Sequence, residues 1–281
     1  MIAYKGFDKD LRCKGFQYEV GKTYEEPEAK LCECGFHACK YPLDVFRYYA
    51  PSSSRYCVVE LEDVSESNTD DSKCCGKKIT ILREITVNDM IQASVSYLKK
   101  HYNFNTTNTG NWSAATNTGS WSAATNTGEK SVASNTGDQS VAANTGDQSV
   151  ATNTGDQSAA TNTGSRSVAS NTGDRSVATN TGNWSTATNT GDWSAATNTG
   201  NWSTATNTGD WGTAEVSCKE SVAIVTGRQS KAAGNIGCWL VLTERATNGC
   251  VLNMQAVKVD GNTIKPNVYY TLIGGKVVEA E

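Results

Sequence analysis

A nine-residue pattern of invariant small positions and variable positions runs from residue 108 to residue 213. Twelve copies follow one another without an insertion, with the consensus Asn-Thr-Gly-x-x-Ser-x-Ala-x. Position six is almost always Ser and position eight is Ala, whereas position five is Trp, Lys, Gln or Arg. Side chains alternate between the two faces of a strand. The pattern therefore points Asn, Ser and Ala inward, and positions five, seven and nine outward.

Such a repeat predicts a thin parallel β-solenoid, because Thr, Asn, Ser and Gly are poor helix formers. Two copies closing on each other give a coil of about 18 residues, so twelve copies make 12/2 = 6 coils. Degenerate copies up to Ala232 add one or two more. The glycine of each copy predicts a turn with unusual φ and ψ, and the inward Asn predicts a ladder of stacked amides. The repeat lacks the G-G-x-G-x-D spacing of calcium-binding nonapeptides, so no calcium is expected.

The flanking segments differ from the repeats in composition and predict a mainly β protein in three parts. Residues 1–104 predict a small α+β head that also caps the N-terminal end of the solenoid. Residues 105–236 form the solenoid, and residues 237–281 form a β-rich cap that covers its last sheet edges. The head contains a short helix after Pro42 and a longer one from Asn88, its expected N-cap, to Lys100.

Charge and cysteine content narrow the class of protein. The formal net charge is −4 and the pI is near 5.4, which makes nucleic acid an improbable partner. No apolar run is long enough for a transmembrane helix, and the first residues do not resemble a signal peptide. We therefore expect no membrane association, a cytoplasmic location or a place in a phage-encoded particle, and ten mostly reduced cysteines.

The residues at position five form two columns if each coil has 18 residues. One column reads Trp112, Lys130, Gln148, Arg166, Trp184, Trp202, and the other reads Trp121, Gln139, Gln157, Arg175, Trp193, Trp211. Trp184 is expected to stack on Trp202, and Trp193 on Trp211. The six tryptophans are a candidate surface for self-association, for a protein partner or for a sugar, and an aromatic ladder that stabilises the sheet is the alternative.

Two other rows repeat once per coil. Aspartates at position four form a row of like charges, which must be solvated or must face cations. The row contains Asp138, Asp156, Asp174, Asp192 and Asp210. Outward threonines at positions nine and two, as in Thr116-Asn117-Thr118, are similar to the ice-binding face of some solenoid antifreeze proteins, although Ser134, Ala143 and Ser170 interrupt them.

The head resembles an uncharacterised N-terminal domain family of bacterial and phage proteins, whose members often carry nonapeptide arrays. The resemblance lies in the segment Leu31–Cys39, which reads LCECGFHAC, the PLD at 42–44 and the Tyr48-Tyr49 pair. It covers about the first hundred residues and implies no activity.

A second resemblance is to ADP-ribosyltransferase-like folds. It rests on Gly35-Phe36-His37-Ala38, a following helix and a strand that contains two glutamates. It implies an enzyme in the head with His37, Tyr48, Glu60 and Glu62 in its site, although the early-strand His or Arg of those folds has no convincing counterpart here.

The head also contains a weak candidate zinc site, because thiolate and imidazole are preferred zinc ligands. Its residues are Cys32, Cys34, His37 and Cys39. Their spacing differs from the usual C-x2-C pattern, and buried reduced thiols are the alternative, so no metal or cofactor is expected.

Three functions follow from these patterns. The repeats contain no His, no Cys and no convergent carboxylate pair, which favours a non-catalytic structural protein that associates with itself or with a partner. A transferase-like head with the solenoid as a spacer is the second. A solenoid that binds ice or carbohydrate is the third.

Overall fold

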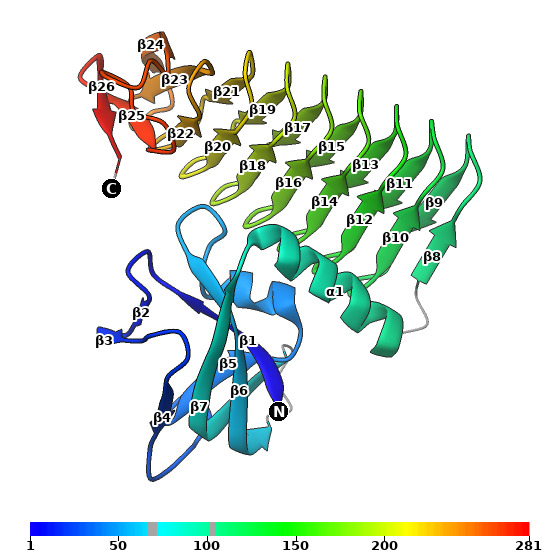
Figure 1. Ribbon diagram of the computed structural model, residues 1–281, viewed down its shortest axis with the longest axis vertical. Helices are drawn as coiled ribbons and strands as arrows, with labels where there is room; N and C mark the ends of the chain where they lie inside the picture. The colour runs from blue at the N-terminus through cyan, green and yellow to red at the C-terminus, as the bar shows by residue number, and fades with distance from the viewer. Residues whose placement is uncertain (67–71, 102–104, 281) are drawn as a thin grey trace. The chain divides into compact units, whose positions relative to one another are not determined.

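The computed structural model describes residues 1–66, 72–101 and 105–280 and is mainly β (Figure 1). The chain forms two compact units, Met1–His101 and Tyr102–Glu281. No disulfide joins any of the ten cysteines, all of which lie in the described part of the chain. Within the same residues, no helix has the length and apolar character needed to span a membrane.

The first unit is a small α+β head built on antiparallel strands. Its strands are β1 (Ile2–Phe7), β2 (Arg12–Cys13), β3 (Phe16–Gln17), β4 (Thr23–Glu25), β5 (Phe36–Cys39), β6 (Arg55–Glu66) and β7 (Lys73–Ile85). The main sheet has the order β4-β7-β5-β1-β6, and β6 also pairs with β7. The pairings β7–β5–β1–β6–β7 therefore close on themselves. Ala3 and Phe7 of β1 belong to the core inside, together with Leu61 and Ile81.

Two helices complete the head. The 3-10 helix η1 (Pro42–Arg47) begins with proline, whose missing N–H costs nothing in a first turn. The helix α1 (Val87–His101) begins after Thr86 rather than at Asn88. The Thr86 hydroxyl accepts the N–H of Asp89, and the Asp89 carboxylate accepts the N–H of Thr86. This reciprocal cap lies two residues earlier in the sequence than the predicted N-cap.

The second unit is a parallel β-solenoid of eight coils, each with about 18 residues (Figure 1). Sheet I contains β8 (Asn105–Asn108), β10 (Ala123–Asn126), β12 (Val141–Asn144), β14 (Ala159–Asn162), β16 (Val177–Asn180), β18 (Ala195–Asn198), β20 (Thr213–Val216) and β22 (Lys231–Gly234). Sheet II contains β9 (Ala114–Asn117), β11 (Val132–Asn135), β13 (Val150–Asn153), β15 (Val168–Asn171), β17 (Thr186–Asn189), β19 (Thr204–Asn207), β21 (Val222–Val225) and β23 (Trp239–Arg245). Neighbouring strands pair in register, so that Ala142 lies beside Ala160.

The interior of the solenoid confirms the predicted inward positions. The alanines at position eight form a continuous buried cluster, as Ala151 and Ala160 do. The serines at position six and the asparagines at position one are buried beside them, except near the first coil. Only small side chains fit there, so the core is thin.

The predicted ladder of stacked amides is wrong, because the asparagines bond to the backbone of the turns. The Asn153 Nδ2 donates to the carbonyl of Ser140, at 3.0 Å, and to that of Ala159, at 3.3 Å. Its Oδ1 accepts the N–H of Gly155. Each buried Asn thus ties its own turn to the turn of the preceding coil and satisfies groups that would otherwise be buried without partners.

The glycines at position three are required by close packing and not by an unusual φ. None of them has a φ in the left-handed region. A Cβ added to Gly155 would overlap the carbonyl of Gly137, one coil earlier, and the same overlap occurs at every later glycine of the series. The residue with a left-handed φ is the one at position five, such as Gln148 at 54°.

Position five therefore lies in a turn and not on the face of a sheet, which corrects the sequence interpretation. Each strand contains only positions seven, eight, nine and one, because positions two to six form the turn. The turns that lead from sheet I to sheet II make edge 1 of the solenoid, and the turns that lead back make edge 2. The two predicted columns of position-five residues follow these two edges.

The C-terminal residues add antiparallel strands to the last coil. These strands are β24 (Val251–Lys258), β25 (Tyr270–Ile273) and β26 (Lys276–Glu279). β24 pairs with β23, and β25 pairs with β22 and β26. In the last coils the inward Asn is replaced by Val216 and Val225, which pack with Leu240 and Tyr270 in an apolar core.

We predict that Gly155→Ala destabilises the protein by about 1–3 kcal/mol, because the new methyl group must displace the backbone of the preceding coil. Gly119→Ala is the matched control, since its Cβ would meet only Asn117 Oδ1, at 3.8 Å. That change should alter the free energy of unfolding by less than about 1 kcal/mol, in the stabilising direction. Denaturant unfolding measures both, and equal losses would contradict the packing argument.

Candidate functional site

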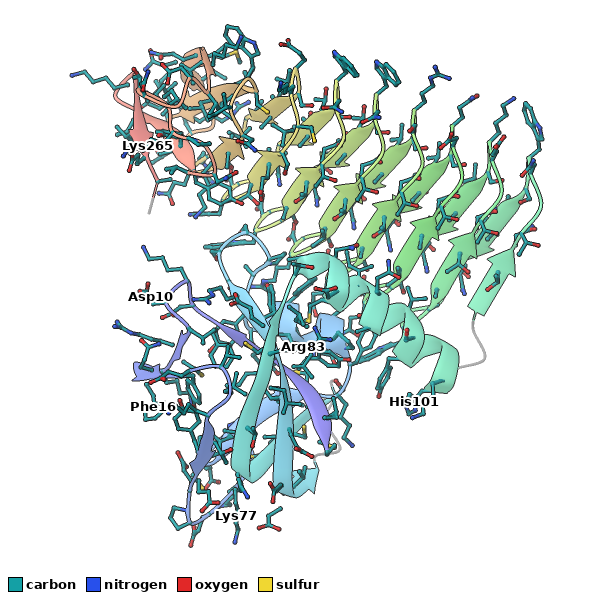
Figure 2. All side chains as sticks on the ribbon, in the orientation of Figure 1. Asp10, Phe16, Lys77, Arg83, His101 and Lys265 are labelled. Carbon is teal, nitrogen blue, oxygen red and sulfur yellow. The ribbon has the colours of Figure 1, made fainter. Side chains whose placement is uncertain are left out.

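Edge 1 presents a column of aromatic and cationic side chains (Figure 2). Trp184 and Trp202 stack with ring centroids 5.2 Å apart and planes 10° apart, as the sequence predicts. Arg166 lies over Trp184, with its guanidinium carbon 5.6 Å from the ring centroid, and Lys130 lies 4.5 Å from the centroid of Trp112. Each cation therefore gains a cation–π contact with a ring one coil away.

Edge 2 carries the second predicted stack, Trp193 on Trp211, with centroids 4.9 Å apart and planes 7° apart. The Trp211 indole N–H donates to Gln229, and Arg228 lies 5.7 Å from the Trp211 ring centroid. In the polar middle of this edge, Gln139 donates to Gln157 at 3.4 Å. Of the two stacks, the one on edge 1 is more exposed, with 54% of both rings accessible against 39% of Trp193.

The aspartates at position four form a hydrogen-bonded row along edge 2. The Asp156 carboxylate accepts the backbone N–H of Asp174 at 2.9 Å, and Asp174 accepts that of Asp192 at 2.8 Å. The row continues through Asp210, which accepts the N–H of Arg228 at 2.7 Å. A carboxylate at this position therefore links successive coils, which offsets the repulsion within the row. The sequence indicated the row but not these bonds.

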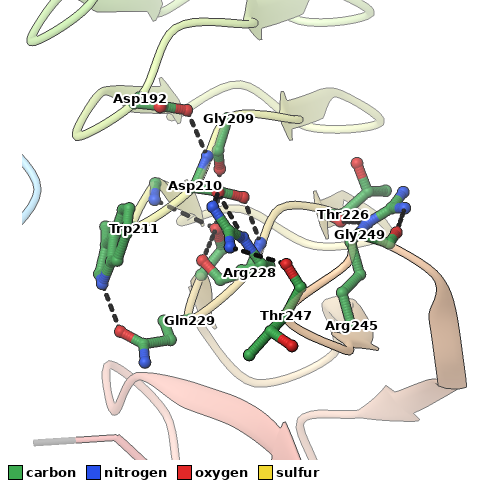
Figure 3. A network of polar contacts seen from close by, with 12 residues as sticks. Asp192, Gly209, Asp210, Trp211, Thr226, Arg228, Gln229, Arg245, Thr247 and Gly249 are labelled. Atoms are coloured by element: carbon green, nitrogen blue, oxygen red, sulfur yellow. Dashed lines mark hydrogen bonds and ion pairs between the residues drawn. The ribbon is translucent and has the colours of Figure 1, made fainter.

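A cation closes the C-terminal end of the aspartate row (Figure 3). The Arg228 Nε donates to the Asp210 carboxylate at 2.6 Å and a second guanidinium nitrogen pairs with the same oxygen. Arg228 also reaches the carbonyl of Thr247, and Arg245 donates to the carbonyls of Thr226 and Gly249. Burial raises the pKa of Asp210, but the bonds from Arg228 outweigh it, so the pKa lies below its usual value.

The head contains a cavity of about 940 Å³. Strands β1, β4 and β5, the hairpin of β2 and β3, and the end of η1 supply its walls. Aromatic side chains dominate these walls, and three lysines and three thiols are interspersed among them. The aromatic residues are Tyr4, Phe16, Tyr18, Tyr24, Phe36, Tyr48 and Tyr49; the lysines are Lys5, Lys14 and Lys73; the thiols are Cys13, Cys32 and Cys39.

Lys5 is the buried cation of this cavity. It lies on the inward face of β1, between the core residues Ala3 and Phe7, and is only 6% exposed. Its ammonium donates to the carbonyl of His37 at 2.8 Å and to the sulfur of Cys13. Desolvation lowers the pKa of Lys5. The sequence signal for this residue is a lysine at an inward position of an apolar strand, which the sequence interpretation missed.

His37 lies in the same cavity as a hydrogen-bond acceptor. Its Nε2 accepts the backbone N–H of Cys32 at 2.8 Å. Burial lowers the pKa of His37, and the charges of Lys73, Lys5 and Lys14 lower it further. The imidazole is therefore neutral near pH 7, in a positive electrostatic field.

The structure brings together two of the four residues of the transferase hypothesis. His37 and Tyr48 line the cavity, whereas Glu60 and Glu62 are not among its described lining residues. Glu60 is exposed on β6, and Glu62 forms an ion pair with Lys78, at 3.1 Å. The alternation along β6 places its even-numbered glutamates on the outer face, away from the core residues Val59 and Leu61.

The four residues of the zinc hypothesis are not arranged to hold a metal ion. Among the described residues, no group of three or more His, Cys, Asp or Glu has such a geometry. The His37 nitrogen that faces Cys32 is occupied by a backbone N–H, and Cys39 is buried at the far end of β5. Three of the four, Cys32, His37 and Cys39, line the same cavity without converging on one point.

Comparison with known proteins matches the head to one family and gives no activity. Residues 1–93 match the family described as Domain of unknown function (DUF7666). Neither the curated proteins nor the solved structures contain a match to this chain.

We predict that Arg228→Gln lowers the melting temperature near pH 7 and that its effect is smaller at about pH 3, below the unfolded pKa of Asp. The folded pKa of Asp210 is below its unfolded value, so this carboxylate stabilises the protein above that unfolded value. The contribution is lost as the pH falls through the folded pKa. Lys219→Gln is the matched control, because Lys219 occupies the same repeat position on edge 1. Calorimetry at both pH values checks the prediction, and a loss of equal size at both would refute it.

Proposed function

We propose that this protein is a non-catalytic interaction scaffold whose solenoid associates with a second copy of the chain along edge 1. The observation that carries the proposal is the row of exposed tryptophans and cations on that edge. Trp112 is 76% exposed, and Trp184 and Trp202 are each 54% exposed. Tryptophan and arginine are enriched at protein interfaces and contribute much of their binding free energy.

The backbone holds this column rigidly, which favours binding. The N–H of each position-five residue donates to the position-four carbonyl of the next coil, as Lys130 does to Asp147 at 2.8 Å. The left-handed φ at position five repeats in every coil, between 49° and 60° for the twelve copies. The side chains therefore leave the turns in a fixed direction and lose little backbone freedom on binding.

The order of residues along edge 1 is complementary to itself. An antiparallel alignment of two copies about a two-fold axis places Trp112 opposite Trp202 of the second copy. The same alignment places Lys130 opposite Trp184 and Gln148 opposite Arg166. No two like charges meet among these positions, and each lysine faces a ring. Two-fold symmetry is the commonest arrangement of homo-oligomers, and this narrow surface suits a weak dimer.

Stacking also favours a protein partner over a sugar on edge 1. Sugars bind to open ring faces, but Trp184 has Arg166 near one face and Trp202 against the other. Both faces of Trp184 are therefore covered. The head supports the transferase alternative less well, because Glu60 and Glu62 lie outside the cavity lining.

We expect the double change Trp184→Ser and Trp202→Ser to convert a micromolar dimer into a monomer, as measured by light scattering. The stack itself contributes about 0.5–1.5 kcal/mol, so the variant should remain folded. Trp193→Ser with Trp211→Ser is the matched control, because it removes an equivalent stack from edge 2.

The control variant should lose similar stability and keep the dimer. A parent protein that is monomeric at high concentration would refute the proposal. Loss of the dimer in both variants would show that edge 1 is not the specific surface.

Sheet II supports a second candidate function, the binding of ice. Its outward threonines recur in register on some neighbouring strands, as Thr188 beside Thr206 shows, and the position-two threonines such as Thr154 are exposed. If this face binds ice, the full chain at millimolar concentration shows thermal hysteresis, and Thr154→Lys with Thr172→Lys abolishes it. The absence of hysteresis in the parent protein would exclude this candidate.

A further inference from the structure

The cavity of the head has no role in the scaffold function, and its chemistry points to a ligand. The cavity is formed entirely by residues of the first unit. Its volume of about 940 Å³ is in the range of sites for small molecules and cofactors.

The buried amine of Lys5 has no carboxylate partner among the described residues. Its contacts are the His37 carbonyl, the Cys13 sulfur, and the rings of Phe7 and Tyr18 at 5.5 and 5.9 Å. A buried charge of this kind is costly unless an opposite charge is nearby. An anion bound beside Lys5 would supply that charge.

Two carboxylates also line the cavity, but neither is among the groups that shift the pKa of Lys5. Glu25 lies 3.6 Å from the Lys78 ammonium, and Glu26 accepts the N–H of Gly35 at 2.9 Å. Lys14 and Lys73 add two more positive charges to the wall, and together with Lys5 they lower the pKa of His37. The electrostatic potential of the cavity around Lys5 is therefore positive.

Aromatic rings form the part of the wall that lies beside Lys5. Phe16 contacts Tyr24 edge-on at 5.4 Å, and Tyr18 contacts Tyr24 at 5.1 Å. Phe16, labelled in Figure 2 on the hairpin of β2 and β3, is 52% exposed although it belongs to this cluster. A planar ring placed in the cavity would find offset and edge-on partners there.

We propose that the head cavity binds a small organic anion that carries a planar aromatic ring. Lys5 receives the anionic group, with Lys14 and Lys73 nearby, and the cluster of Phe16, Tyr18 and Tyr24 receives the ring. A nucleoside monophosphate and an aromatic carboxylate are two sources of this chemistry. In this proposal Lys5 only binds the anionic group, and it takes part in no covalent step.

The test is isothermal titration calorimetry of the full chain with AMP, 4-hydroxybenzoate, adenosine and inorganic phosphate. We expect saturable binding of AMP or of 4-hydroxybenzoate, and at least about tenfold weaker binding of adenosine and of phosphate, since each lacks one of the two groups. Binding of AMP alone identifies a phosphate ester as the source, and binding of 4-hydroxybenzoate alone identifies a carboxylate.

Lys5→Met should weaken the binding at least about tenfold, which is the loss expected for one charged hydrogen bond. Its melting temperature should be unchanged or higher, because an apolar side chain replaces a buried charge. Lys77→Met is the matched control, since Lys77 is exposed on β7 and does not line the cavity. Lys14→Met, on an exposed residue, tests the anion site without touching the core.

Three results would overturn the proposal. The first is the absence of saturable heat with both AMP and 4-hydroxybenzoate. The second is unchanged affinity in both Lys5→Met and Lys14→Met. The third is binding of adenosine as tight as that of AMP, which would show that the lysines do not recognise the phosphate group.

Discussion

The solenoid depends on the close approach of backbones at position three of each repeat. A side chain on Gly155 would overlap the carbonyl of Gly137, so the closest stacking of the turns requires glycine, which all twelve copies have at this position. In the degenerate copy that follows them, Cys218 occupies it. This approach brings the N–H of each position-five residue to a carbonyl of the next coil and fixes a left-handed turn there. The side chains of positions four and five then point out of the turns in columns. The same contact therefore sets both the register of the strands and the composition of the two edges.

The sequence is sufficient to predict the strands, the inward positions and the pairs of stacked tryptophans, because all of them follow from a period of nine and a coil of 18. It is not sufficient to predict the turn. Glycine suggests a positive φ, but the local sequence cannot reveal that a neighbouring coil occupies the space of its Cβ. The role of Asn153 was missed for a similar reason, since its partners Ser140 and Ala159 are defined only once the coils are stacked.

The head was harder to predict because its cavity is assembled by antiparallel pairing over long sequence distances. Tyr4 of β1 pairs with Cys39 of β5, and β5 pairs in turn with β7, which brings Lys5 to His37. The motif around Cys32 and His37 drew attention to the correct segment but suggested a metal. In the structure, that segment supplies a neutral imidazole and a carbonyl that contacts an ammonium. Local spacing could not distinguish these two kinds of chemistry.

The division between constant and variable positions is informative about function in its own right. Positions one, three, six and eight are constrained by burial or by contact between coils, so substitution there costs stability. Positions four and five lie in the turns with their side chains outside the core, yet they are not random: aspartates follow edge 2 at position four, and each edge carries three tryptophans at position five, of which the stacked pair on edge 1 is the more exposed. The carboxylates have a structural explanation in the hydrogen bonds between coils, such as the one that the N–H of Asp174 donates to the carboxylate of Asp156.

The exposed rings of edge 1 contribute a stack that a hydrogen-bonded pair of polar side chains could replace, as Gln139 and Gln157 show on edge 2. Stability alone therefore does not account for tryptophan at the exposed end of edge 1, and this is the reason for proposing contact with another molecule there.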